Sequence, residues 1–170
     1  MKRLKTHVAT HVTQVLVTAA ILLGITAGVV YATNVHFKNS PRLTSVNNGD
    51  LTLTVSGALT GLGNGDVTIT VTADATPTTT CTNQGGNQAP GQNPGDIVVV
   101  GSVTIPANSI KNGNVAFAVR TGAPAQPTWD QAGCANSNWT AAIDTLTFNS
   151  YTITVEQPSG SGIIVLQQTF

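Results

Sequence analysis

The chain has few charged and few aromatic residues, and this scarcity excludes some classes of protein. Charged residues make up 8% and aromatic residues 5% of the 170 residues, whereas soluble domains carry about 25% charged residues. Three of the seven basic residues, Lys2, Arg3 and Lys5, lie at the N-terminus, so four basic residues face seven acidic ones in the remainder, a net charge of −3. A mildly acidic surface without a basic cluster argues against nucleic-acid binding.

Motifs for catalysis and metal binding are also missing from the sequence. It contains no G-x-S-x-G, no H-E-x-x-H, no phosphate-binding loop and no D-x-D-x-D-G calcium run. Beyond residue 32 the only histidine is His36, which is far in sequence from both cysteines. Acid–base catalysis and metal sites need several such groups together. The sequence therefore predicts no catalytic residue, no metal site and no cofactor.

Residues 1–32 have the pattern of a secretory signal. A basic start precedes an apolar run at residues 15–30, and Val30-Tyr31-Ala32 offers small residues at the cleavage positions. The alternative is an uncleaved anchor, because about 18 apolar residues are near the lower limit for spanning a bilayer. In that case the membrane is contacted only through residues 15–32. We expect cleavage near Ala32 and a secreted or cell-surface protein of residues 33–170.

After the signal, nearly every periodic segment alternates apolar and hydroxyl residues, as strands with one buried face do. Residues 97–100 are apolar on both faces and predict a central strand, with a bulge or bend at Gly101. No segment predicts a helix, although residues 139–146 would give one short turn at most. The remaining predicted strands are 35–37, 51–55, 67–71, 103–105, 115–119, 146–148, 152–155 and 163–166.

Asn-Gly pairs introduce three of the predicted strands, at Asn48, Asn64 and Asn112. Asn-Gly accepts positive φ and reverses the chain into the next strand. Seven to nine short strands separated by such turns are typical of an all-β domain. We therefore predict a single antiparallel Greek-key β-sandwich of immunoglobulin-like type, with a jelly roll as the alternative.

The two cysteines, Cys81 and Cys134, are predicted to form a disulfide because an exported chain folds in an oxidising compartment. The closed loop would hold about 54 residues, which in the chain-entropy model corresponds to roughly 4 kcal/mol of stabilisation. In an immunoglobulin domain the core tryptophan lies between the two cysteines, whereas Trp139 follows the second one here. We interpret the disulfide as a staple between two irregular loops.

These two loops, residues 81–95 and 133–139, are rich in amides and lack charge. They could bind a neutral polar ligand such as a sugar, with a tryptophan as a stacking platform. The alternative is an ordered surface loop whose amides satisfy its own backbone, above packed tryptophans. The candidate ligand-binding residues are Asn83, Gln84, Asn87, Gln92, Asn93, Trp129, Asn136, Asn138 and Trp139.

The first loop reads Cys-Thr-Asn-x-Gly-Gly-Asn-x-Ala-Pro-Gly-Gln-Asn-Pro at residues 81–94, and Gly-Cys-x-Asn-x-Asn-Trp follows at residues 133–139. In these motifs the sequence resembles a group of small, uncharacterised secreted bacterial proteins. The resemblance extends over most of residues 33–170. It implies export and a β-sandwich fold, and it carries over no activity.

Three functional hypotheses follow from the sequence. The first is an exported, non-enzymatic β-sandwich that acts by binding, for example to a glycan, or by structure at the cell surface or in the matrix. The second is a subunit of an extracellular fibre that self-associates by strand addition at open edges near residues 35–37 and 163–170. The third, a secreted hydrolase, has the least support because acid–base groups are so few.

Overall fold

The computed structural model describes residues 32, 34–47 and 49–170. The expected signal segment lies outside the described residues except for Ala32, which packs against the core beside the buried Val35. In this part of the chain no helix is long and apolar enough to cross a membrane.

Nine strands and one short 3₁₀ turn make up the described part, which confirms the all-β prediction. In chain order they are β1 (His36–Phe37), β2 (Arg42–Asn47), β3 (Thr52–Thr60), β4 (Val67–Asn83), β5 (Gln88–Pro90), β6 (Ile97–Ile105), η1 (Ala107–Ser109), β7 (Val115–Arg120), β8 (Trp139–Glu156) and β9 (Ile164–Thr169). The prediction of a helical turn at residues 139–146 is wrong, because these residues form the first half of β8. The sequence did not predict β2 or β5.

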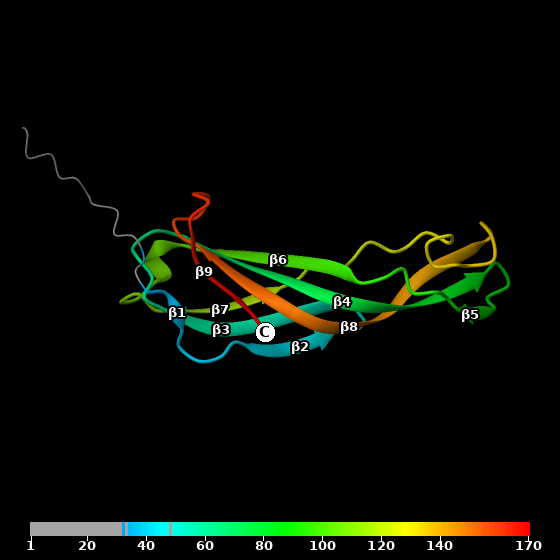
Figure 1. Ribbon diagram of the computed structural model, residues 1–170, viewed down its shortest axis with the longest axis horizontal. Coiled ribbons are helices and arrows are strands. Elements are labelled where there is room, and N and C mark those ends of the chain that lie inside the picture. Colours follow the sequence, from blue (N-terminus) through cyan, green and yellow to red (C-terminus); the bar gives the residue numbers. More distant parts are fainter. Residues whose placement is uncertain (1–31, 33, 48) are drawn as a thin grey trace, which may run out of the picture.

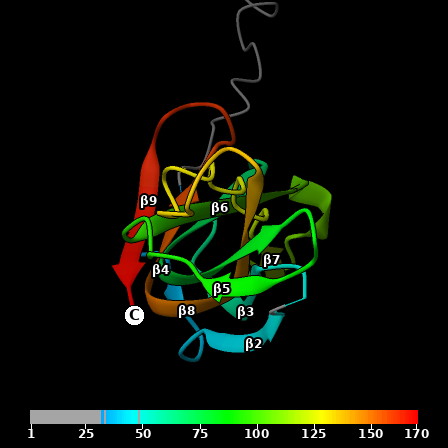
Figure 2. The same cartoon turned by 90° about the vertical axis from the view of Figure 1, so that its right-hand side faces the viewer.

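The strands form two antiparallel sheets that pack together as a β-sandwich (Figures 1 and 2). In the first sheet β3 is central, with β1 and β2 along one side and β7 along the other. In the second sheet β4 is central, with β8 along one side and β6 followed by β5 along the other. The last strand, β9, pairs with the outer side of β8.

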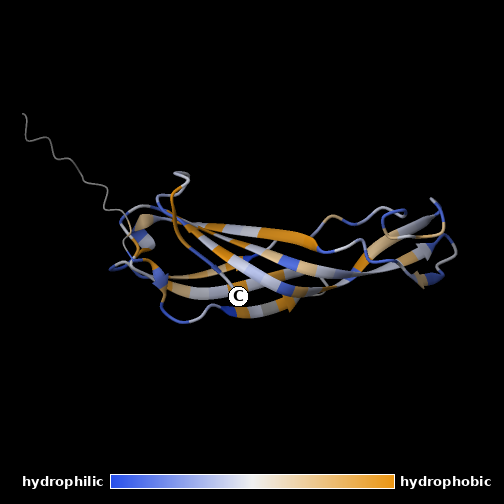
Figure 3. Ribbon diagram, viewed as in Figure 1, coloured by the Kyte–Doolittle hydropathy of each residue, from blue (hydrophilic) through white to orange (hydrophobic). Residues whose placement is uncertain are grey.

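The core lies between the sheets and is formed by the buried apolar residues of the alternating strands. Figure 3 shows where hydrophobic residues occur along the strands. Phe117 lies over Gly57 on the neighbouring strand, and a Cβ atom at Gly57 would stand only 2.9 Å from the Phe117 ring. Glycine therefore leaves the space that this ring fills. The fully or almost fully buried residues of the main cluster include Leu53, Val55, Leu59, Val67, Ile69, Val71, Ala73, Val119, Ile153 and Val155.

One side of the sandwich is closed where β6 meets the end of β7. A Cβ atom at Gly101 would lie 2.1 Å from the carbonyl oxygen of Arg120, and the N–H of Gly122 donates to the carbonyl of Val100 at 2.9 Å. Of the bulge or bend predicted at Gly101, the bulge is wrong, because β6 pairs with β4 without a register shift. The central position predicted for residues 97–100 is also wrong: of the described strands β6 pairs with β4 alone, and Val98 is 59% exposed.

The opposite side is closed by aromatic rings. Phe170 stacks on Tyr151 with ring centroids 5.2 Å apart and meets Phe37 edge-on at 5.7 Å. Phe37 in turn lies 6.3 Å from Phe117. Backbone bonds in both directions between Phe170 and Tyr151 extend the pairing of β9 with β8 by one residue. These rings join the edges of the two sheets.

The Asn-Gly turn prediction is confirmed at Asn112 but not at Asn64, where neither Asn64 nor Gly65 has a positive φ. Asn112 and Gly113 have φ values of 51° and 72°, and the flanking residues Lys111 and Asn114 pair across the turn. This is the positive-φ hairpin geometry that Asn-Gly favours. Asn48 lies outside the described residues. The loop around Asn64 is fixed by the buried Gln157, whose side-chain amide bonds to the backbone of residues 63 and 65.

Two strands extend beyond the rest of the sandwich. Residues 76–83 of β4 and 139–147 of β8 pair with each other past the end of the first sheet, toward the right of Figure 1. Pro77 is buried in this extension, between Ala75, the last β4 partner of β6, and Thr80, the first partner of β5. None of the described strands pairs with that side of β4 at Pro77, so its missing N–H removes no ladder bond. We call this extension, with its covering loops, the arm.

Candidate functional site

The arm is held together by the disulfide between Cys81 and Cys134, whose Cα atoms are 5.7 Å apart. The predicted pairing is confirmed. Cys81, however, lies inside strand β4 on its buried face, and only Cys134 lies in an irregular loop. The disulfide therefore fastens a loop to a strand and does not join two loops.

The loop of residues 121–138 covers the inner face of the arm, where the first sheet no longer reaches. Ala132 is completely buried and forms a small cluster with the two cysteines, against which Trp139 and Ala141 pack. The N–H of Gln92 donates to the carbonyl of Ala132 at 2.7 Å. The N–H of Ile143 donates to Oε1 of Gln126 at 2.7 Å. The loop thus replaces the missing sheet as the cover of this small core.

At the tip of the arm, β4 turns into β5 through an Asn-centred turn. Oδ1 of Asn83 accepts bonds from the N–H groups of Gly85 at 3.0 Å and Asn87 at 2.9 Å. The backbone N–H of Asn83 also donates to the carbonyl of Asn87. Asn83 therefore has a structural role, as the alternative interpretation of the loop expected. The side chain of Gln84 and that of Asn87 are exposed at the tip.

The other candidate amides also divide into side chains with a structural role and side chains that are exposed. Oδ1 of Asn136 accepts the N–H of Asn138 at 2.9 Å, so it closes the turn before β8. The side chain of Gln92 lies against Gly133, where a Cβ atom would approach it to 2.8 Å. Asn93 and Asn138 are exposed. The residues that the sequence prediction named lie at one end of the molecule, but the prediction did not separate structural amides from exposed ones.

The two tryptophans have different environments. Trp139 is half-buried and packs on the disulfide cluster. Trp129 is 38% exposed, and its carbonyl accepts the N–H of Cys134 at 2.8 Å. Next to it, a hydrogen bond from the Thr128 side chain lowers the pKa of the exposed Asp130 carboxyl. Trp129 is therefore the more exposed of the two tryptophans.

A shallow concavity of about 220 Å³ lies on the arm beside β5. The sequence prediction missed it, because Thr79 and Thr80 belong to a run of threonines that gives no binding signal. Thr80 donates to the carboxylate of Asp144, and the buried Thr79 hydroxyl donates to the carbonyl of Gln92. The residues that line it are Thr79, Thr80, Gln88, Ala89 and Pro90.

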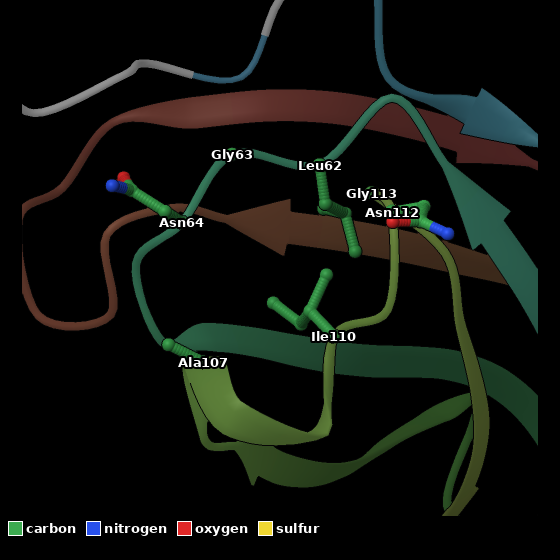
Figure 4. A pocket seen from close by; sticks show the side chains of 7 residues that line it. All are labelled: Leu62, Gly63, Asn64, Ala107, Ile110, Asn112 and Gly113. Carbon is green, nitrogen blue, oxygen red and sulfur yellow. The ribbon is translucent and has the colours of Figure 1, made fainter.

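A second concavity, of about 350 Å³, lies at the opposite end of the molecule. In Figure 4 the side chains of Leu62 and Ile110 point toward each other from two loops, and Asn64 and Asn112 lie at the rim. The N–H of Leu62 donates to the carbonyl of Gly113 at 3.1 Å, which ties these loops together. No candidate ligand-binding residue lies here.

Carboxylates on the outer face of the second sheet bind neighbouring hydroxyl groups. Ser150 donates to Asp74 at 3.0 Å, and Thr76 donates to Asp96 at 2.6 Å. Within the described ranges, no group of three or more histidine, cysteine, aspartate or glutamate side chains is placed to hold a metal ion.

Comparison of the chain with protein-family models, curated proteins and solved structures found no match.

Proposed function

We propose that this protein is an exported, non-enzymatic β-sandwich that presents its arm to a neutral polar ligand such as a glycan. One observation carries the proposal: the two ends of the molecule differ. Ala32 and Val35, which follow the basic and apolar leader, pack at one end, whereas the disulfide and the amide-rich loops lie at the other (Figure 1). A leader at one end leaves the arm free to project outward.

The chemistry of the arm tip supports an uncharged ligand. No residue from Asn83 to Gly95 carries a charge, and Gln84, Asn87 and Asn93 are exposed. Side-chain amides both donate and accept, which suits the hydroxyl groups of a sugar. Trp129 adds an exposed indole ring, and ring faces are common in sites that hold small polar ligands.

Export and cell-surface location belong to the same proposal. The basic start and apolar run of residues 1–32 support secretion with cleavage near Ala32. The oxidised pair Cys81 and Cys134 fits an oxidising compartment. Cleavage after Ala32 would leave the buried Val35 in place, so the sandwich would keep its N-terminal contact.

We also propose that the connections are immunoglobulin-like. Strands β2, β3 and β7 face β6, β4, β8 and β9, and this supports the order A-B-E against C′-C-F-G that sandwiches of this type use. No strand pairs with the outer side of β7 within the described residues, so a D strand beside E has no counterpart. A jelly roll would need eight strands in two Greek keys and has less support.

The fibre hypothesis has one specific observation in its favour. Ile163 and Ile164, at the start of β9, are 42% and 50% exposed beside an edge strand. A fibre built by strand addition needs two complementary edges, because a self-complementary contact closes after two copies. The second predicted edge, β1, has only two residues, and Val35 before it is buried. Ligand binding therefore remains the first proposal.

Retention on a glycan array tests the proposal. The exported chain, purified without reductant, should be retained on neutral glycans, and Trp129→Ala should weaken retention about tenfold, the effect of a 1.4 kcal/mol contact. Asn64→Ala, an exposed substitution at the opposite concavity, is the matched control and should leave retention unchanged. Absence of retention on a broad array would contradict the proposal. Loss of retention with Asn64→Ala but not with Trp129→Ala would place the ligand site at the opposite end of the molecule, beside the second concavity.

A further inference from the structure

Strand β9 forms one edge of the second sheet. Among the described residues it pairs with β8 only, and Phe170 and Tyr151 exchange both of their backbone bonds. Hydrogen-bonding direction alternates along an antiparallel strand. The N–H and C=O groups of Gln167 and Thr169 therefore point away from β8, toward the outside of the sheet. The side chains of residues 167–169 are exposed, as expected for an edge without a covering segment.

Three other edges in the described part of the chain, those of β8, β6 and β2, are covered or irregular. The free half of β8 contains two register shifts, carries the charge of Asp144 and has its Ile143 N–H occupied by Gln126. On β6, the Val100 carbonyl accepts the N–H of Gly122. Strand β2 has a register shift and carries Arg42. Bulges, charges and covering loops are the usual means of preventing edge-to-edge pairing.

β9 has none of this protection over most of its length. It contains no charged residue and no proline, and its one register shift lies at its start, between Ile164 and Leu166. From Leu166 to Phe170 the strand is regular. An uncharged, regular and exposed edge is a template for pairing with another strand.

We propose that β9 pairs antiparallel with β9 of a second copy of this chain, across a twofold axis at Gln168. The segment Leu-Gln-Gln-Thr-Phe at residues 166–170 is complementary to itself in this register. Gln167 faces Thr169 of the second copy and exchanges backbone bonds with it. Leu166 faces Phe170 of the second copy on the core side, and the two copies of Gln168 face each other. No like charges meet.

This pairing joins two second sheets into one continuous sheet and goes beyond the proposed function. Because paired edge strands run antiparallel, the two long axes also run antiparallel and the two arms point in opposite directions. The contact is isologous, so assembly stops at two copies. The dimer therefore offers two ligand-binding ends that face different surfaces, and it does not extend into a fibre.

Native mass spectrometry of the exported chain tests the dimer with a matched pair of variants. The unmodified chain and Gln167→Ala should both show twice the protomer mass. Gln167→Pro removes an outward N–H that β8 does not use, so the fold should remain, by circular dichroism, while the mass falls to one protomer. A single protomer for the unmodified chain at all concentrations would overturn the proposal, as would a dimeric Gln167→Pro or multimers larger than two.

Oxidative crosslinking tests the register without relying on the proline variant. Residues that face each other in a non-hydrogen-bonded pair have Cα atoms about 4.5 Å apart, within disulfide range. Gln168→Cys should therefore form a disulfide between two copies. Gln167→Cys is the control, since its own counterpart lies diagonally, about 7–8 Å away. Crosslinking of Gln167→Cys but not of Gln168→Cys would overturn the proposed register.

Discussion

At Gly101 the backbones of the two sheets approach more closely than a side chain would allow. An added Cβ would lie 2.1 Å from the Arg120 carbonyl oxygen and 2.8 Å from Cα of Thr121. Both neighbours are backbone atoms, so a rotamer change cannot relieve the clash. The side of the sandwich between β6 and β7 is closed here by backbone alone.

Gly101→Ala should lower the free energy of unfolding by about 3 kcal/mol, at the upper end for overpacking, because the strands must separate. Gly122→Ala is the matched control: its added Cβ would meet the Val100 carbonyl oxygen at an ordinary 3.7 Å. Urea denaturation of both variants provides the measurement. Equal stability of the two would show that β6 and β7 do not approach in this way.

Tyr151 should make the free energy of unfolding decrease at alkaline pH, because burial raises the pKa of its phenol. In the unfolded chain this pKa is about 10. As the pH rises above that value the unfolded state ionises first, so stability should fall until the pH reaches the folded pKa. Tyr151→Phe keeps the ring stacked on Phe170 and should remove this contribution. The measurement is the difference between the denaturation midpoints of the two proteins, taken from about pH 8 to about pH 11, a range that includes the ordinary tyrosine pKa of about 10. A constant difference across this range would contradict the prediction.

At single residues, sequence-based predictions were correct where few partners were available. Cys81 had only Cys134 to pair with, and Asn112 with Gly113 has one strongly favoured turn geometry. They failed at Gly101, because a close approach depends on which strand lies opposite. They also could not separate Asn83, which fixes a turn, from the exposed Asn87, because both are amides in the same loop.

At the level of elements, β4 and β8 were predicted much shorter than they are. Alternation with large apolar residues marks β4 only as far as Val71, and the inward positions that follow carry small or polar residues, including Pro77, Thr79 and Cys81. A loop covers this part of the strand, so large side chains would not fit beneath it. The periodicity therefore disappears although the strand continues. The arm could not be derived from hydrophobic pattern alone.

Removal of the disulfide should loosen the arm more than the main sandwich. Replacing both cysteines by alanine frees the covering loop and should cost about 4 kcal/mol in the chain-entropy model, given the 53-residue separation. Amide hydrogen exchange should accelerate in residues 77–83 and 139–147, while Val71 and Ile153, in the main core, exchange only through global unfolding. Uniform loss of protection across both regions would show that the arm is not a separate unit.

At the scale of the whole molecule, the two ends of the sandwich differ, and we propose that one end receives the leader and the other binds the ligand. Ala32 enters at the end that holds the Leu62–Ile110 concavity, and the disulfide arm forms the other end (Figure 1). The sequence predicted a sandwich with an oxidised cysteine pair, and both are confirmed. The sequence did not indicate that the two ends differ, because this difference depends on where β4 and β8 extend beyond the first sheet. We propose that the chain is exported and that its arm faces outward to bind a ligand.

The intact mass of the protein exported by its own host, measured without reductant, tests that claim most directly. We expect one species with the mass of residues 33–170, lighter by two hydrogens because Cys81 and Cys134 are oxidised. A chain that keeps residues 1–32 and two free thiols would contradict export to an oxidising compartment, and with it the assignment of the arm as an outward-facing binding end.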